Sequence, residues 1–158
     1  MGSVQLDTKP ARDAWPGFLT GLGVFGFVVS YMVAGSTDWG PPGTSAYGTY
    51  QTANRLVALP IVLLIGGVLS LGVTGRGRMS WLERVGWAVT LGGSVLLLVG
   101  NVAEFWVFTS RTYVDPARLG SWRLFLLGGS SLIIGGILWG VATARNQSVS
   151  LQREPVSR

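Results

Sequence analysis

An amide and a carboxylate lie three positions apart at the end of a long apolar run. Residues 100–106 read GNVAEFW, a spacing that places Asn101 and Glu104 on one face of a helix. An ionisable group at the centre of a bilayer costs about 2.5–3.5 kcal/mol on insertion scales, so it is by default a functional hypothesis. Such a pair can bind an ion, a proton or a lipid head group, or an arginine can neutralise it.

Two arginines are expected at the level of Glu104. Arg55 begins the second apolar segment of the chain, and Arg123 lies in the first turns of the fourth. The sequence therefore predicts a structural clamp, in which Glu104 pairs with Arg55 or Arg123 and Asn101 fills the remaining hydrogen bonds. Two alternatives stay open: a site for an ion, proton or head group, and an interface with another subunit.

The pair also ends a polar stripe. At 100° per residue, Thr90, Ser94, Asn101 and Glu104 project within one arc of about 80°, and Glu83 falls on the same arc. A polar stripe along an otherwise apolar helix should face protein or a wet cavity. We therefore expect this side of the helix to be covered.

A second group of candidates follows the first apolar segment. Aromatic and charged residues there could line a pocket above the helices, or contact lipid or a partner. The candidates are Asp38, Trp39, Tyr47 and Tyr50, with Arg55, Arg111 and Arg118. Residue spacing does not separate these interpretations.

The composition removes most catalytic chemistry. The chain has no cysteine and no histidine, so thiol catalysis and the commonest metal ligand and general base are excluded. We expect no metal and no cofactor. An enzyme would have to use Glu104, Asp38 or Asp115 as its acid–base group, and a single carboxylate without a second partner is weak support for that activity.

Four apolar segments must position these residues. The 158-residue chain is 48% hydrophobic and 12% charged, against roughly 25% charged in an average soluble protein. Each segment approaches the roughly 20 residues that a helix needs to cross a bilayer. The sequence predicts an all-α, integral membrane four-helix bundle over 15–145, with helices at about 16–35, 56–74, 85–108 and 119–144. Residues 1–14 are expected to be a cytoplasmic segment and 146–158 a mobile cytoplasmic tail.

Two signals shape the connections between the predicted helices. Residues 35–54 form the longest connection, and Pro41-Pro42-Gly43 predicts a turn within it. Asp115-Pro116 indicates an N-cap followed by proline at the first helical position, so the last helix is expected to begin outside the membrane.

Charge in the connections predicts the orientation. If the N-terminus is cytoplasmic, eight Lys/Arg lie inside and four outside, so the positive-inside rule favours both termini inside. Eleven arginines to one lysine, together with 24 glycines, suggest a GC-rich bacterial genome. We therefore expect a multi-pass protein of a bacterial inner membrane.

Glycine spacing indicates helix packing. Gly17 and Gly21, like Gly136 and Gly140, are small residues four apart, a pattern that lets helix backbones approach closely. With so little catalytic chemistry, the sequence favours a non-catalytic subunit or accessory protein of a membrane complex, packed on other subunits or on itself. The alternative is a small transporter or ligand-binding protein that uses Asn101 and Glu104 with Arg55 or Arg123. No basic surface of the kind that binds nucleic acid is predicted.

Overall fold

The fold is entirely helical in the part of the chain that the structure describes, a computed structural model covering residues 10–38, 40–41, 43–75, 77–112 and 114–152. The elements are α1 (Pro10–Gly35), α2 (Ser45–Leu56), α3 (Ala58–Gly75), α4 (Trp81–Val102), the π-helical turn η1 (Ala103–Val107) and α5 (Pro116–Gln152). These described residues contain no strand. Four helical stretches are long and apolar enough to cross a membrane: Ala14–Gly35, Ser45–Gly75, Trp81–Val107 and Pro116–Asn146.

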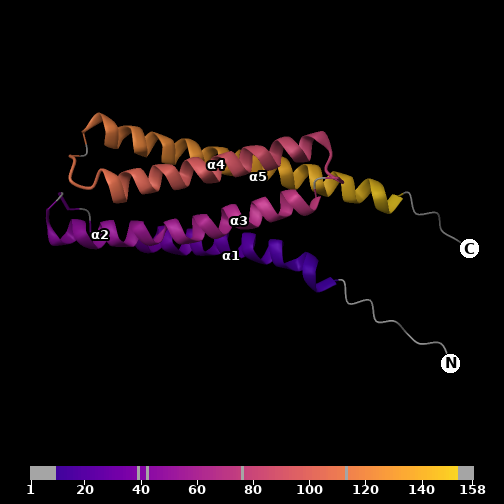
Figure 1. The fold of residues 1–158 in the computed structure, drawn as a ribbon, viewed down its shortest axis with the longest axis horizontal. Helices are drawn as coiled ribbons and strands as arrows, with labels where there is room; N and C mark the ends of the chain where they lie inside the picture. Colours follow the sequence, from indigo (N-terminus) through magenta and orange to yellow (C-terminus); the bar gives the residue numbers. More distant parts are fainter. Residues whose placement is uncertain (1–9, 39, 42, 76, 113, 153–158) are drawn as a thin grey trace, which may run out of the picture.

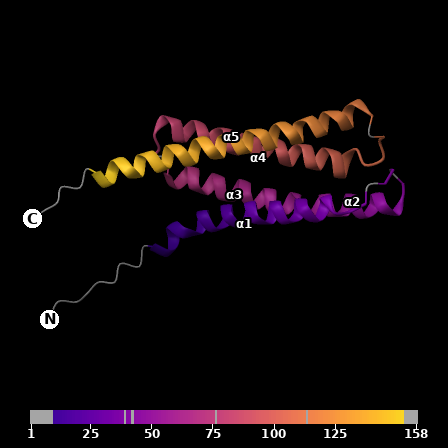
Figure 2. The same cartoon turned by 180° about the vertical axis from the view of Figure 1, so that it is seen from behind.

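The helices form two antiparallel pairs (Figures 1 and 2). α1 packs on α3 and α4 packs on α5, while α3 and α4 connect the pairs through a short turn. α1 begins and α5 ends at the same end of the molecule, as four crossings require (Figure 1). We call this the turn end, because the α3–α4 turn also lies there, and the opposite end, which carries α2, the α2 end.

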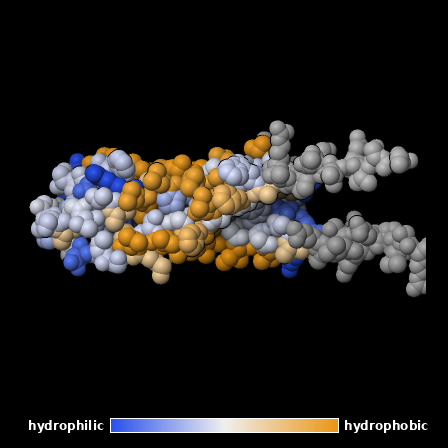
Figure 3. Space-filling model, turned by 90° about the horizontal axis from the view of Figure 1, so that it is seen from below, coloured by the Kyte–Doolittle hydropathy of each residue, from blue (hydrophilic) through white to orange (hydrophobic). Residues whose placement is uncertain are grey.

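The outer surface of the bundle is apolar. On the face in view, Figure 3 shows orange hydrophobic residues over much of the middle of the molecule, with bluer residues toward both ends. All four long helices expose large hydrophobic side chains, and we call this surface the apolar girdle. Large side chains project from it into the surroundings, among them Phe25, Met32 and Ile133. A water-soluble monomer rarely exposes an apolar surface of this extent. The four apolar helices therefore suggest a multi-pass membrane protein.

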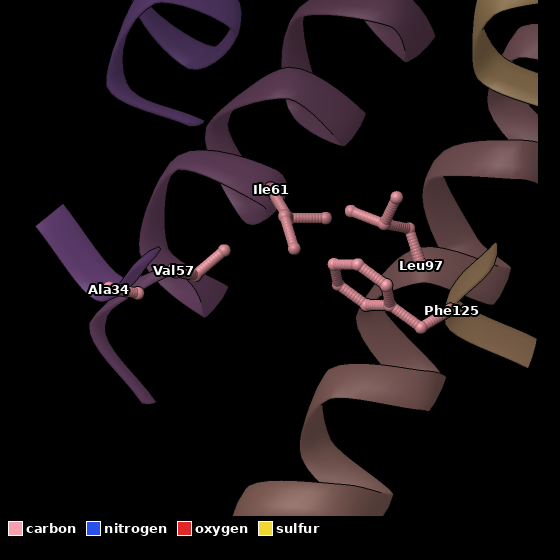
Figure 4. Packing of buried hydrophobic residues seen from close by; sticks show 5 residues of the cluster. All are labelled: Ala34, Val57, Ile61, Leu97 and Phe125. Atoms are coloured by element: carbon pink, nitrogen blue, oxygen red, sulfur yellow. The ribbon is translucent and has the colours of Figure 1, made fainter. Parts of the chain in front are cut away.

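The two pairs meet through side chains toward the α2 end. Ile61 of α3, Leu97 of α4 and Phe125 of α5 point toward one another (Figure 4), and Ala34 and Val57 complete the cluster. Phe125 also stacks on Tyr31 of α1, with 6.3 Å between ring centroids. These contacts link α1 and α5, whose backbones do not come together.

α4 and α5 approach closely because glycines face each other along their contact. A Cβ atom on Gly93 would lie 2.6 Å from the Leu132 nitrogen and 2.8 Å from the Gly128 oxygen. Seven residues along α4, a Cβ on Gly100 would lie 2.6 Å from the Phe125 nitrogen. In contrast, a Cβ at Gly17, Gly21, Gly136 or Gly140 would meet nothing within 4 Å, so those spaced pairs are not used inside the described fold.

The helix boundaries differ from the predicted ones before α3. The sequence predicts an irregular connection over 35–54, but α2 forms there, because the Thr44 hydroxyl caps it by accepting a hydrogen bond from the Tyr47 N–H at 3.3 Å. α2 ends at Leu56, four residues before Pro60. The proline ring carries no N–H and crowds the carbonyl of the residue four places earlier, so the helix breaks there.

The ends of the helical region also differ from the prediction. α1 starts at Pro10, and α5 runs to Gln152, into the segment 146–158 that the sequence predicts to be a mobile tail. Asn146 on this extension donates a hydrogen bond to the Glu83 carboxylate at 2.6 Å. That bond ties the end of α5 to the first turn of α4.

The predicted start of the last helix is confirmed. Asp115 precedes Pro116, the first residue of α5, and its carboxylate accepts a hydrogen bond from the Ala117 N–H at 2.9 Å. This backbone bond and the Arg111 guanidinium at 3.0 Å lower the pKa of Asp115 below its usual range. The cap fixes which residues form the first turns of α5.

Candidate functional site

Glu104 lies in a π-helical turn that ends α4. In η1 the Phe108 N–H donates to the Ala103 carbonyl at 2.9 Å, a bond that spans five residues instead of four. π-turns are rare and occur frequently at functional sites. The wider turn changes the helical phase just where the polar stripe of α4 ends, and Glu104 and Phe105 are both buried.

The cation beside Glu104 is Arg118, not Arg55 or Arg123. Arg118 Nε lies 3.8 Å from Glu104 Oε1, and the two side chains are 2% and 7% exposed. Arg118 also donates to the Arg111 carbonyl at 2.8 Å and to the Tyr47 hydroxyl at 3.0 Å. One guanidinium therefore connects α5 with η1, with α2 and with the connection before α5.

Helical phase explains why Arg123 is elsewhere. Arg118 lies in the first turn of α5, and Arg123 follows it by five residues, which is about 140° further around the helix. Arg118 is buried against η1, and Arg123 is exposed. The predicted Glu104–Arg123 pair therefore places the cation on the wrong side of α5.

Arg55 binds the backbone next to Glu104 instead of its carboxylate. Arg55 Nε donates to the Phe105 carbonyl at 2.8 Å, and its guanidinium lies 5.1 Å from the Trp106 ring centroid. Gln51, one turn earlier on α2, donates to the same carbonyl at 3.2 Å. The last carbonyls of a helix have no partners within the helix, and here α2 supplies the donors.

Asn101 of α4 bonds to the backbone of α2, as Arg55 of α2 bonds to the backbone of η1. Its Nδ2 donates to the Asn54 carbonyl at 3.0 Å, in the last turn of α2 before the break at Val57. Asn54 in turn donates to the Tyr50 carbonyl at 2.9 Å. Side chains from each helix thus satisfy backbone carbonyls in the irregular end of the other.

Aromatic rings cover this cluster. Tyr47, Tyr50 and Phe105 are all buried, and the Tyr50 and Phe105 rings meet edge to face with 5.6 Å between centroids. The Arg118 guanidinium lies 5.4 Å from the Tyr47 ring centroid. The two predicted tyrosines therefore belong to the site, on a helix and not on a loop. Asp38 is exposed, and Trp39 lies outside the described residues.

Two buried acceptors in the cluster lack donors. Asn101 Oδ1 and Glu104 Oε2 accept no hydrogen bond from the described part of the chain, although their residues are 1% and 6% exposed. Buried polar atoms are nearly always hydrogen-bonded, so such atoms call for an explanation. Among the described residues no group of three acidic side chains could hold a metal ion.

The rest of the polar stripe is buried, as predicted. Thr90 and Ser94 donate to the carbonyls of Gly86 and Thr90 at 2.8 Å, within their own helix. Glu83 instead caps the start of α4 by accepting from the Ser80 N–H at 2.6 Å. Both ends of the stripe therefore contact other helices, through Asn146 of α5 at Glu83 and through Asn54 and Arg118 at Asn101 and Glu104.

Sequence reasoning missed three residues of the cluster. Gln51 and Asn54 were not predicted to belong to the cluster, because a connection rich in glycine, proline and hydroxyl residues does not indicate a helix. Arg118 was grouped with the aromatic candidates and not with Glu104. The Asp115-Pro116 start signal was sufficient to place Arg118 in the first turn of α5, where it reaches the end of α4.

Comparison with known proteins adds no family to this description. The chain matches no protein-family model, no curated protein and no solved structure.

Proposed function

We propose that the chain is a multi-pass protein of a bacterial inner membrane with its turn end in the cytoplasm. The apolar girdle around four long helices supports insertion. Arg78, Arg84 and Arg145 are exposed at the turn end, as the positive-inside rule favours for a cytoplasmic end.

Single-cysteine variants test the orientation, because the natural chain has no cysteine. A Ser36→Cys variant should react with a membrane-impermeant maleimide in cells whose outer membrane alone is opened. A Gly77→Cys variant should react only after the inner membrane is opened as well. Labelling of both positions from the same side would refute four crossings.

Within that membrane, the function best supported is that of a non-catalytic subunit or accessory protein of a larger assembly. The observation that carries this proposal is the open face of α1. Only 11% of its apolar window is buried, against 17% for Pro116–Asn146 and 39% for both Ser45–Gly75 and Trp81–Val107. That face holds Gly17 and Gly21, where a Cβ would meet nothing within 4 Å, beside exposed Phe18 and Leu22. Small residues four apart let a second helix approach its backbone.

A double Gly17→Leu, Gly21→Leu variant tests the assembly role. Leucine side chains would hold a partner helix away from α1, and we expect about tenfold less of the associated protein, or of the self-associated form, after mild solubilisation. Gly92→Leu is the matched control, since Gly92 is exposed on α4 with nothing within 4 Å. A wild-type protein that is strictly monomeric and free of partners would count against the proposal.

A small transporter or ligand-binding protein is the second candidate, favoured by the two buried acceptors. Asn101 Oδ1 and Glu104 Oε2 could both accept hydrogen bonds from one small donor-bearing guest. Against this role, aromatic rings seal the cluster and Arg118 already neutralises the carboxylate. Wild-type stability in the Arg118 variant described below, combined with lost binding or transport, would favour this candidate.

A further inference from the structure

A cleft of about 990 Å³ opens at the turn end of the molecule. One wall comes from α3 and the turn that follows it, and the other comes from the second half of α5. It exists because α3 and α5 both pack on α4 but not on each other. Its volume lies at the upper end of the roughly 300–1,000 Å³ that small-molecule sites occupy.

The α5 wall is mostly apolar, with Thr143 as its polar residue. Gly136 and Gly140 lie one turn apart on it, and a Cβ on either would meet nothing within 4 Å. Trp139 lies beside them in the same lining. Glycines one turn apart leave a shallow channel along a helix, which suits a flexible hydrocarbon chain, and tryptophan favours the level of the lipid head groups.

The mouth of the cleft is basic. Arg78 lines it and is exposed, and it forms no ion pair with any other residue in the described ranges. The acidic residue in the lining is Glu83, whose Oε2 already accepts hydrogen bonds from the Ser80 N–H and from Asn146, both at 2.6 Å. Arg84 and Arg145 are exposed on the neighbouring turns of α4 and α5. Because Glu83 is buried, the exposed charge beside the cleft comes from Arg78, Arg84 and Arg145 and is positive.

We propose that this cleft binds one anionic phospholipid of the surrounding bilayer, with its phosphate at Arg78 and an acyl chain along Gly136 and Gly140. Arginine matches phosphate in charge and in the geometry of its donors. Basic pockets between membrane helices are established places for anionic head groups. The proposal rests on membrane insertion, but not on the orientation or on a partner for α1.

The experiment compares two lipids on the purified full-length chain in a neutral detergent. Dioleoyl phosphatidylglycerol, at about 100 times its dissociation constant, should raise the unfolding temperature by about 5–10 °C. Dioleoyl phosphatidylcholine carries the same acyl chains without net charge and should raise it much less. Equal shifts with both lipids, or no shift with either, would overturn the proposal.

Variants locate the effect. Arg78→Gln should remove the difference in unfolding temperature between the two lipids. Gly140→Leu should do the same, because the leucine side chain fills the channel. Arg123→Gln, which changes an exposed arginine at the opposite end of the molecule, should keep it. A phosphatidylglycerol shift that survives Arg78→Gln would contradict the assignment, and this variant suffices if Gly140→Leu fails to fold. Failure of membrane insertion is recognised separately, because the protein would then leave the membrane fraction in alkaline carbonate.

Discussion

Replacing Arg118 with methionine is expected to lower the free energy of unfolding by about 3–5 kcal/mol, because it leaves the buried Glu104 carboxylate without its cation. The substitution also removes the hydrogen bonds to Tyr47 and to the Arg111 carbonyl. Unfolding of the purified protein in detergent, by heat or by a denaturing detergent, measures the loss.

Two further variants separate the ion pair from general damage to α5. A double Glu104→Gln, Arg118→Met variant should be more stable than Arg118→Met alone, since no charge is then buried unpaired. Arg123→Met changes an exposed arginine on the same helix and should stay within about 0.5 kcal/mol of the wild type. Wild-type stability of Arg118→Met would show that the cluster is not a structural clamp.

Gly93→Ala should destabilise the protein by about 1–3 kcal/mol, since the added methyl group meets backbone atoms of α5 and not the end of a flexible side chain. The helices would have to separate along a contact that Gly86, Gly100, Gly128 and Gly135 also form. Thermal unfolding in the same detergent measures the effect.

Gly92→Ala is the matched control for this seam. Gly92 precedes Gly93 on α4, but a Cβ there meets nothing within 4 Å. Because alanine is the better helix former, the control should be neutral or more stable by up to about 1 kcal/mol. Equal losses of stability in Gly92→Ala and Gly93→Ala would mean that close packing at Gly93 does not cause the destabilisation.

The sequence predicted most of the helical architecture. Four apolar runs of sufficient length account for the four long helices, and the Asp115-Pro116 signal placed the start of α5 correctly. It did not predict α2, whose residues are mostly small and polar, because the helix depends on the Thr44 cap and on packing of Tyr47 and Tyr50 against Phe105. Such contacts are tertiary and leave no periodic apolar pattern.

The candidate site was predicted in part for a similar reason. Asn101 and Glu104 were visible because polar residues at the end of an apolar run are conspicuous. The cation that pairs with Glu104 could not be identified from the sequence, because it depends on which arginine of α5 faces η1. The π-turn was not visible either, because its residues, AEFWV, carry no signal that separates it from an α-helix.

The two irregular helix ends also determine how the halves of the molecule can associate. In lipid, apolar side chains gain little by leaving hydrocarbon for another helix, so hydrogen bonds and fit must select the docking register. Asn101 bonds to the Asn54 carbonyl while Arg55 bonds to the Phe105 carbonyl, so two donors and two acceptors must align together. A slip of α2 by one residue would leave all four groups without these partners, and Asn54, Asn101 and Phe105 are buried. Reciprocal bonding between these two ends therefore fixes the register in which the two antiparallel helix pairs join.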